Sequence, residues 1–121
     1  MFLLYKLGEA ETKFANIIWD NEPMNSGELV IKCEILLSWK KSTTYTILKK
    51  LSSKGFFKNE NTIVTSLISR NDYSKMQSEE FIETSFNGSL PKFLTAFMNG
   101  KILKKNEIIE IKNLIESHME D

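Results

Sequence analysis

A cluster of lysines without any acidic neighbour is the feature of this sequence with the clearest chemistry. Six lysines lie between Ser38 and Asn59, whereas the whole chain of 121 residues has a formal net charge of zero. They are Lys40, Lys41, Lys49, Lys50, Lys54 and Lys58. Because ammonium groups bind phosphates, this segment is a candidate nucleic-acid surface. A solvated helix face that binds nothing is the alternative.

The same segment has the periodicity of a helix with two distinct faces. One face has the spacing of a buried stripe and consists of Thr44, Ile47, Leu48 and Leu51. The opposite face carries shorter polar groups and consists of Ser42, Tyr45, Thr46 and Lys49. Polar groups of this kind reach base edges in a DNA groove, while lysines beside them meet phosphates. The pattern therefore favours a helix that reads nucleic acid.

Two helices are expected before this one. The first includes residues 12–20 and ends before Pro23, because proline cannot continue a helix. Its apolar stripe consists of Ala10, Phe14, Ile17 and Ile18. The second follows Asn25 as N-cap, with Glu28 placed for a capping box. Its expected buried residues are Leu29, Val30, Cys33 and Leu36.

A tight turn joins the second helix to the lysine-rich third helix. The break is expected at Leu37–Ser38, with Trp39 as an anchor. The third helix is expected over residues 41–54 and stops at Gly55, which suits a C-terminal cap. Two helices in this arrangement, the second with the polar face, make a helix-turn-helix.

After Gly55 the sequence changes to two β-prone runs. These are Phe56–Asn59 and Thr62–Ile68, with Glu60–Asn61 as a short turn. A hairpin directly after a recognition helix is a wing. We therefore expect a mainly α fold with a small β-hairpin, in which residues 1–70 form a winged helix-turn-helix DNA-binding domain. A domain of about 70 residues is small but able to fold on one core.

Residues 71–121 are expected to form a helical dimerisation domain. Helices are predicted over about residues 73–86, 89–97 and 105–118. Apolar residues outnumber what three short helices can bury, and the expected dimer interface consists of Leu90, Phe93, Leu94, Phe97, Ile108, Ile111, Leu114 and Ile115. A homodimer would present two recognition helices to two half-sites. Packing of these helices back on the winged helix is the alternative.

Several short strings occur in one characteristic order and spacing. They are Glu9-Ala10-Glu11, Ile17-Ile18-Trp19, Trp39, Thr43, Thr46, Lys54-Gly55-Phe56, Tyr73, Phe86-Asn87-Gly88-Ser89-Leu90 and Phe93-Leu94. On these residues the chain, from Leu7 to about Glu116, resembles the penicillinase-repressor family of winged-helix transcription regulators. The resemblance implies a dimeric transcriptional repressor that binds palindromic operator DNA, with β-lactam resistance or related genes as candidate targets.

The resemblance also implies roles for individual residues of the third helix. By position, the base contacts would be Ser42, Thr43, Tyr45 and Thr46. Lys50 and Lys54 would contact phosphates, and Lys58 on the wing would add backbone contacts. From the lysine cluster itself, Lys41 and Lys49 are expected to contact phosphates as well. Family members usually carry basic residues at the positions of Ser42 and Tyr45, so the operator sequence is not carried over. A second interpretation therefore stays open: an interaction module of the same fold that dimerises with another regulator and binds DNA weakly or not at all.

The family further implies a switch. Its repressors are inactivated by cleavage in the helix that here spans Ser89 to Met98. The matching bond joins Ala96 and Phe97, where relatives commonly carry Asn-Phe. A membrane-bound sensor-protease is then a candidate partner, and release by a ligand is the alternative to proteolysis.

Little in the sequence supports an enzyme, a cofactor or a metal site. The one histidine, His118, is far in sequence from the one cysteine, Cys33, and no glycine-rich phosphate loop is present. Cys33 lies on an apolar helix face and is expected to be a buried structural thiol. Because Met1–Lys6 is too short for a signal peptide and no stretch approaches a membrane span, we expect a cytoplasmic protein without membrane insertion.

Overall fold

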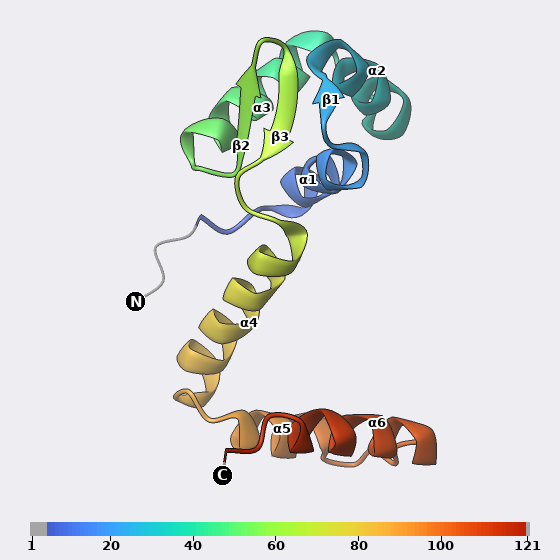
Figure 1. Cartoon of the computed structure of the whole chain (residues 1–121), viewed down its shortest axis with the longest axis vertical. Helices are drawn as coiled ribbons and strands as arrows, with labels where there is room; N and C mark the ends of the chain where they lie inside the picture. The colour runs from blue at the N-terminus through green and yellow to red at the C-terminus, as the bar shows by residue number, and fades with distance from the viewer. Residues whose placement is uncertain (1–4, 121) are drawn as a thin grey trace. The chain divides into compact units, whose positions relative to one another are not determined.

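The computed structural model describes residues 5–120 (Figure 1), so residues 1–4, which belong to the segment considered for a signal peptide, lie outside the described residues. The chain divides into two compact units, Met1–Phe81 and Ile82–Asp121. In chain order the elements are α1 (Glu9–Asn21), β1 (Met24–Asn25), α2 (Ser26–Leu37), α3 (Lys41–Ser53), β2 (Phe57–Glu60), β3 (Ile63–Ser66), α4 (Arg70–Phe86), α5 (Leu90–Met98) and α6 (Lys105–Glu116). Helices with one small antiparallel sheet confirm the predicted fold class.

The first helix, α1, packs its apolar stripe into the core of the first unit. Phe14, Ile17 and Ile18 are buried, as predicted. Ala10, which was expected on the same stripe, is exposed, because an open hollow rather than packed side chains lies over this first turn. The helix ends at Asn21, two residues before Pro23, which agrees with the predicted break.

The second helix, α2, starts and ends on local backbone signals. Asn25 is the N-cap, and its side chain accepts a hydrogen bond from a first-turn N–H at 2.7 Å. Ser38, just past the last turn, has a left-handed φ of 58° that closes the helix. Of the four predicted core residues, Leu29 and Cys33 are fully buried and Val30 is half-buried. The expectation for Leu36 was wrong: it is 64% exposed, because the helix turns Leu37 toward the core instead.

The wing belongs to a three-stranded antiparallel sheet in the order β1-β3-β2. β2 and β3 form the predicted hairpin, but Glu60 pairs with Ile63, so the turn is Asn61–Thr62 rather than Glu60–Asn61. Both turn residues have positive φ, 53° and 65°, as tight hairpins require. The short strand β1, which the sequence pattern did not reveal, pairs with β3 and ties the start of α2 to the wing.

Aromatic rings fill the core of the first unit, between the helices and the sheet. Phe14, Phe56 and Phe57 are at most 1% exposed. The indole of Trp39 stacks on the Phe14 ring with centroids 5.6 Å apart, which confirms the predicted anchor after α2. Burial of one such phenylalanine contributes roughly 1.5–3 kcal/mol. The helix-turn-helix therefore rests on a closed core.

The first turns of α4 are attached to this core. Trp19 donates an indole hydrogen bond at 2.9 Å to a backbone carbonyl just before α4. The guanidinium of Arg70 lies 2.6 Å from the Asp20 carboxylate. The Tyr73 hydroxyl accepts a hydrogen bond from the Leu7 N–H at 2.8 Å. The first compact unit accordingly includes the start of α4, and the domain division after residue 70 stays a prediction.

The second unit consists of the end of α4 together with α5 and α6. Asn87 and Gly88 have φ values of 50° and 77° and follow the last turn of α4. Ser89 caps α5 by accepting a hydrogen bond from the Lys92 N–H at 3.2 Å, and Pro91 lies in the first turn, as predicted. Among the described residues of this unit, none is buried.

Candidate nucleic-acid interface

The recognition-helix candidate, α3, separates its two faces as the sequence predicts. On the core side, Thr44, Leu48 and Leu51 are buried. On the other side, all four candidate base-contact residues are exposed: Ser42, Thr43, Tyr45 and Thr46. Because the packed face fixes the backbone of the helix, these side chains extend from a stable frame. Their role as base contacts stays a prediction.

Tyr45 links the outer face of α3 to α2. Its hydroxyl lies 3.4 Å from the hydroxyl oxygen of Ser26, the first residue of α2. The tyrosine is nevertheless 36% exposed. A side chain that is tethered before binding loses less freedom when it meets a partner. Tyr45 is therefore both accessible and oriented.

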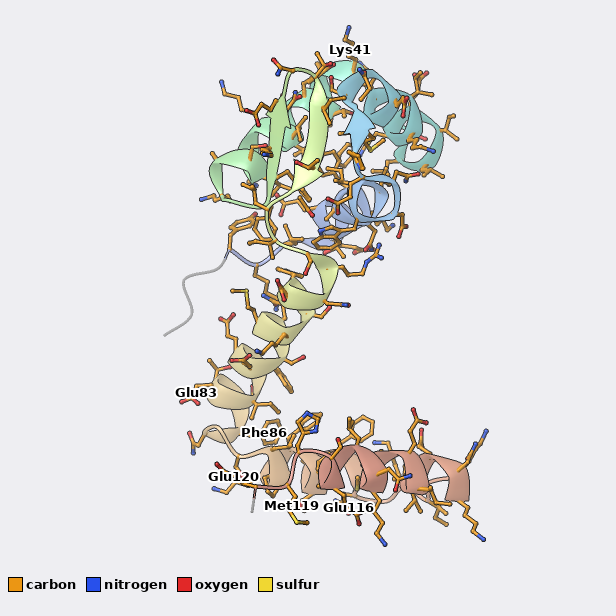
Figure 2. The ribbon with its side chains drawn as sticks, viewed as in Figure 1. Lys41, Glu83, Phe86, Glu116, Met119 and Glu120 are labelled. Carbon is orange, nitrogen blue, oxygen red and sulfur yellow. The ribbon has the colours of Figure 1, made fainter. Side chains whose placement is uncertain are left out.

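Three of the five candidate phosphate contacts are exposed: Lys41 and Lys49 on α3, and Lys54, which follows its last residue. Lys41 is the first residue of the helix and points away from the ribbon (Figure 2). The Lys54 ammonium lies 5.3 Å from the centroid of the Tyr5 ring, a cation–π distance. Exposed lysines thus occur at both ends of the helix and between them.

The wing places a fourth candidate next to α3. Lys58 on β2 lies 3.3 Å from Glu60, and both side chains are at least half exposed. Such a surface pair contributes little free energy in water, so the ammonium remains available to a phosphate. Between α3 and the wing lies an open hollow of about 380 Å³, lined by Tyr45, Leu48, Lys49, Ser52 and Asn59. Helix and wing therefore border one concave surface.

Lys50 differs from the other lysines because it pairs with a buried carboxylate of α1. Its ammonium lies 3.0 Å from Oε2 of Glu11, which is 8% exposed. Burial alone would raise the pKa of the Glu11 carboxyl, but hydrogen bonds from Gly8, Lys50 and Tyr5 outweigh it, so the pKa is lowered. The hydrogen bond to Glu11 raises the pKa of Lys50. Both groups are charged at neutral pH.

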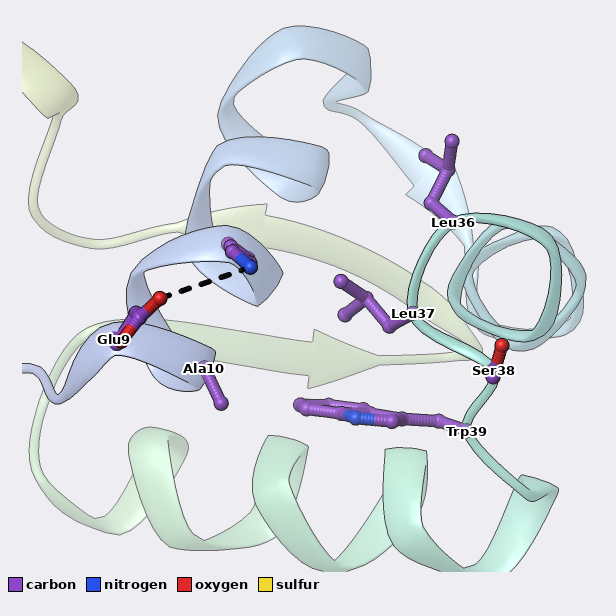
Figure 3. Close-up of a pocket in the computed structure, with 7 residues that line it drawn as sticks. Glu9, Ala10, Leu36, Leu37, Ser38 and Trp39 are labelled. Atoms are coloured by element: carbon purple, nitrogen blue, oxygen red, sulfur yellow. Dashed lines mark ion pairs between the residues drawn. The ribbon is translucent and has the colours of Figure 1, made fainter.

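A second hollow lies between the first turn of α1 and the turn that joins α2 to α3 (Figure 3). Its volume is about 430 Å³, and the indole of Trp39 and the side chains of Leu36 and Leu37 line it. Glu9 and Lys13, which also line it, pair with each other at 3.9 Å. Polar and charged groups from Glu9, Lys13 and Ser38 therefore line the hollow beside the apolar side chains. The sequence pattern did not point to it.

The candidate dimer residues form an apolar surface on the second unit. Five are between 49% and 59% exposed: Leu90, Phe97, Ile108, Leu114 and Ile115. The other three are half-buried: Phe93, Leu94 and Ile111. Monomeric proteins rarely expose a large contiguous apolar patch. The assignment of these residues to a dimer interface stays a prediction.

Ala96 and Phe97, the candidate cleavage pair, lie within α5, and both are exposed. The Lys101 ammonium lies 4.3 Å from the centroid of the Phe97 ring. A peptide bond inside a helix must open locally before a protease can bind it. The end of the helix, near Asn99–Gly100, stays a competing candidate for a cut.

The described residues offer little for metal or redox chemistry. They contain no group of three metal-ligating side chains, and none of their helices is long and apolar enough to cross a membrane. Cys33 is fully buried, as expected for a structural thiol. Burial raises the pKa of this thiol, which disfavours the reactive thiolate.

Comparison with known proteins covers both compact units. The family model described as penicillinase repressor matches residues 7–117. The methicillin resistance regulatory protein MecI of Staphylococcus aureus is 27% identical over 115 residues, which cover 92% of this chain and 94% of that protein. The penicillinase repressor of Bacillus licheniformis is 25% identical over 117 residues, or 93% and 91% of the two chains. A penicillinase repressor of Staphylococcus aureus is 22% identical over 114 residues, or 91% and 90%.

Proposed function

Since the chain belongs to the penicillinase repressor family, whose members repress transcription, we propose that it binds palindromic operator DNA as a homodimer. The outer face of α3 enters the major groove, and the wing contacts the adjacent backbone. The helices of the second unit join two copies. Its partner is double-stranded DNA, so the cytoplasm is its place of action.

The observation that carries the proposal is the composition of α3. An outward face of short polar side chains lies among lysines, in a chain whose formal net charge is zero. Phosphate contacts fix the position of a protein on DNA, and polar side chains read base edges. The proposed base contacts are Ser42, Thr43, Tyr45 and Thr46, and the proposed phosphate contacts are Lys41, Lys49, Lys54 and Lys58.

Two copies are proposed because the apolar side chains of the second unit have no core to enter. A symmetric dimer would cover them and would set two copies of α3 against the two halves of a palindrome. Linking two half-site contacts raises affinity without any new contact to DNA. The dimer is therefore part of the binding mechanism.

The relatives suggest the regulated genes and the switch. Their names refer to penicillinase and to methicillin resistance, so we propose genes of β-lactam resistance, or related genes, as targets. A cut between Ala96 and Phe97 would separate α6 from the rest of the chain and weaken the dimer. A membrane-bound sensor-protease is the proposed agent of that cut.

A second candidate function is an interaction module that dimerises with another regulator. It is favoured by the pairing of Lys50 with Glu11 and of Lys58 with Glu60, since both pairs reduce the positive field of the candidate surface. Under this alternative, DNA binding is weak or absent.

A mobility-shift titration with the chain's own upstream region separates the two functions. We expect binding that weakens steeply with salt and exceeds binding to a scrambled duplex. Thr46→Ala should remove about 1–3 kcal/mol of that discrimination, whereas Thr95→Ala, an exposed threonine on α5, should not. Equal binding of both duplexes by the unmodified chain, or none at low salt, would support the interaction module instead.

A further inference from the structure

The carboxylate of Glu11 in α1 is surrounded by hydrogen-bond donors and pairs with Lys50 of α3. Its Oε1 accepts hydrogen bonds from the Tyr5 hydroxyl at 2.8 Å and from the Gly8 N–H at 2.9 Å. Its Oε2 is inaccessible to water and lies 3.0 Å from the Lys50 ammonium. A carboxylate oxygen removed from water needs a compensating charge. Lys50 supplies that charge.

Lys50 otherwise stands where a phosphate contact would be expected. It lies one turn after Thr46 and next to Lys49, and its side chain is 46% exposed. Lys49 has no ion pair among the described residues, so its ammonium is available to DNA. To turn its ammonium fully to a phosphate, Lys50 would have to leave Oε2 uncompensated. The negative charge of Glu11 would then also act on the approaching phosphate.

We infer that Glu11 is a positioning residue that withholds the Lys50 ammonium from the DNA backbone and so reduces the number of phosphate contacts. The inference rests on the proposed DNA binding. Each phosphate contact strengthens binding to every sequence and steepens its salt dependence by about 0.9. Glu11 therefore lowers affinity for operator and random duplex alike and leaves discrimination between them to the base contacts.

The matched pair Glu11→Gln and Glu9→Gln tests this role. Both variants raise the net charge by one and lie in the first turn of α1. Glutamine at position 11 keeps an oxygen that can accept from Tyr5 and Gly8 but loses the charge that holds Lys50. Glu9 is 90% exposed at its side chain and pairs with Lys13 of α1, so Glu9→Gln reproduces the change in net charge without releasing Lys50.

Binding of a random duplex is measured between 50 and 200 mM salt, with thermal melting as a check on folding. For Glu11→Gln we expect the salt slope to steepen by about 0.9, an additional affinity loss of about threefold over this range. Glu9→Gln should keep the slope of the unmodified chain. The double variant Glu11→Gln with Lys50→Gln should lose the added slope. Equal slopes for the two single variants would overturn the inference.

Lysine acetylation followed by mass spectrometry tests the unmodified chain directly and does not depend on any variant folding. In the free protein, Lys50 should react more slowly than Lys49, because its ammonium is held by Glu11. With duplex added, Lys49 should become protected while Lys50 keeps its free-protein rate. Equal reactivity of the two lysines without DNA would overturn the inference, whereas failure of DNA to protect Lys49 would count against the proposed function.

Discussion

The two compact units of this chain differ in how far their apolar side chains are buried. In the first unit, the rings of Phe14, Phe56 and Phe57 are enclosed by helices and sheet. In the described part of the second unit, no side chain is buried, and Leu114 and Ile115 are more than half exposed. Both units are built from regular helices, so the difference lies in packing rather than in secondary structure.

This difference indicates a division of labour. A unit with a closed core can hold a recognition surface in a fixed geometry by itself. A unit whose apolar side chains stay open gains stability only when another surface covers them. This contrast supports the proposal that the first unit contacts DNA and that the second joins two copies.

The largest expected effect is that of removing the second unit. A chain that ends after Phe81 should fold, because its core is complete, but should be a monomer. Its affinity for a palindromic operator should fall by about 10²–10⁴, since the two half-site contacts are no longer linked. Sedimentation and fluorescence anisotropy measure the two quantities. A truncated chain that still sediments as a dimer would contradict the division of labour.

Removing one aromatic ring should lower the free energy of unfolding far more in the first unit than in the second. Phe14→Ala removes a fully buried ring and should lower the free energy of unfolding by about 3–5 kcal/mol. Phe97→Ala, at a ring that is 52% exposed, should cost much less when measured under conditions where the chain is monomeric. Denaturant titration followed by circular dichroism compares them. Equal losses would show that the second unit has a core of its own.

A matched pair of leucines tests where association occurs. Leu114 in α6 and Leu36 in α2 are 59% and 64% exposed. Leu114→Ala should raise the dimer dissociation constant about 10–100-fold, from the loss of roughly 1.5–3 kcal/mol of leucine burial. Leu36→Ala should leave it unchanged. If the α2 variant weakens the dimer as much, association involves the first unit as well.

The smallest expected effect is a pH dependence confined to the first unit. The pKa of Glu11 is lowered from its ordinary value of 4.5, so its ionised form stabilises the folded state. That contribution is complete above the unfolded pKa and is lost as pH falls through the lower, folded pKa. Below pH 4.5 the unmodified chain should therefore lose stability faster than Glu11→Gln. If the stability of the two proteins falls in parallel with pH, the ionised form of Glu11 does not stabilise the folded state.

Local signals made most elements predictable. Pro23, Gly55 and Gly88 mark helix ends because of their backbone chemistry, and the caps Asn25 and Ser89 act within three residues of themselves. The two faces of α3 follow from helical periodicity: of its predicted core residues, Thr44, Leu48 and Leu51 are buried, and Ile47 is half-buried. Such features depend on short stretches of sequence, which a single chain displays in full.

The features that escaped prediction depend on distant partners or on small rotations. Strand β1 has two residues, too few to show a period, and exists because β3 pairs with it. The hairpin turn lies one residue later than predicted. It includes Thr62 with a positive φ, which β-branched residues rarely adopt, so no sequence signal placed Thr62 in the turn. The rotation of α2 about its axis leaves Leu36 exposed and packs Leu37 against the core. The pairing of Glu11 with Lys50 joins two helices, and no local pattern announces it.

Sedimentation velocity of the whole chain with a labelled duplex from its upstream region tests the central claim most directly. The claim is that one palindrome binds two copies, each through the outer face of α3. We predict a complex whose mass is that of the duplex plus two chains of 14.0 kDa, which dissociates as salt is raised. A complex with a single chain at saturation, or no complex at low salt, would contradict the account.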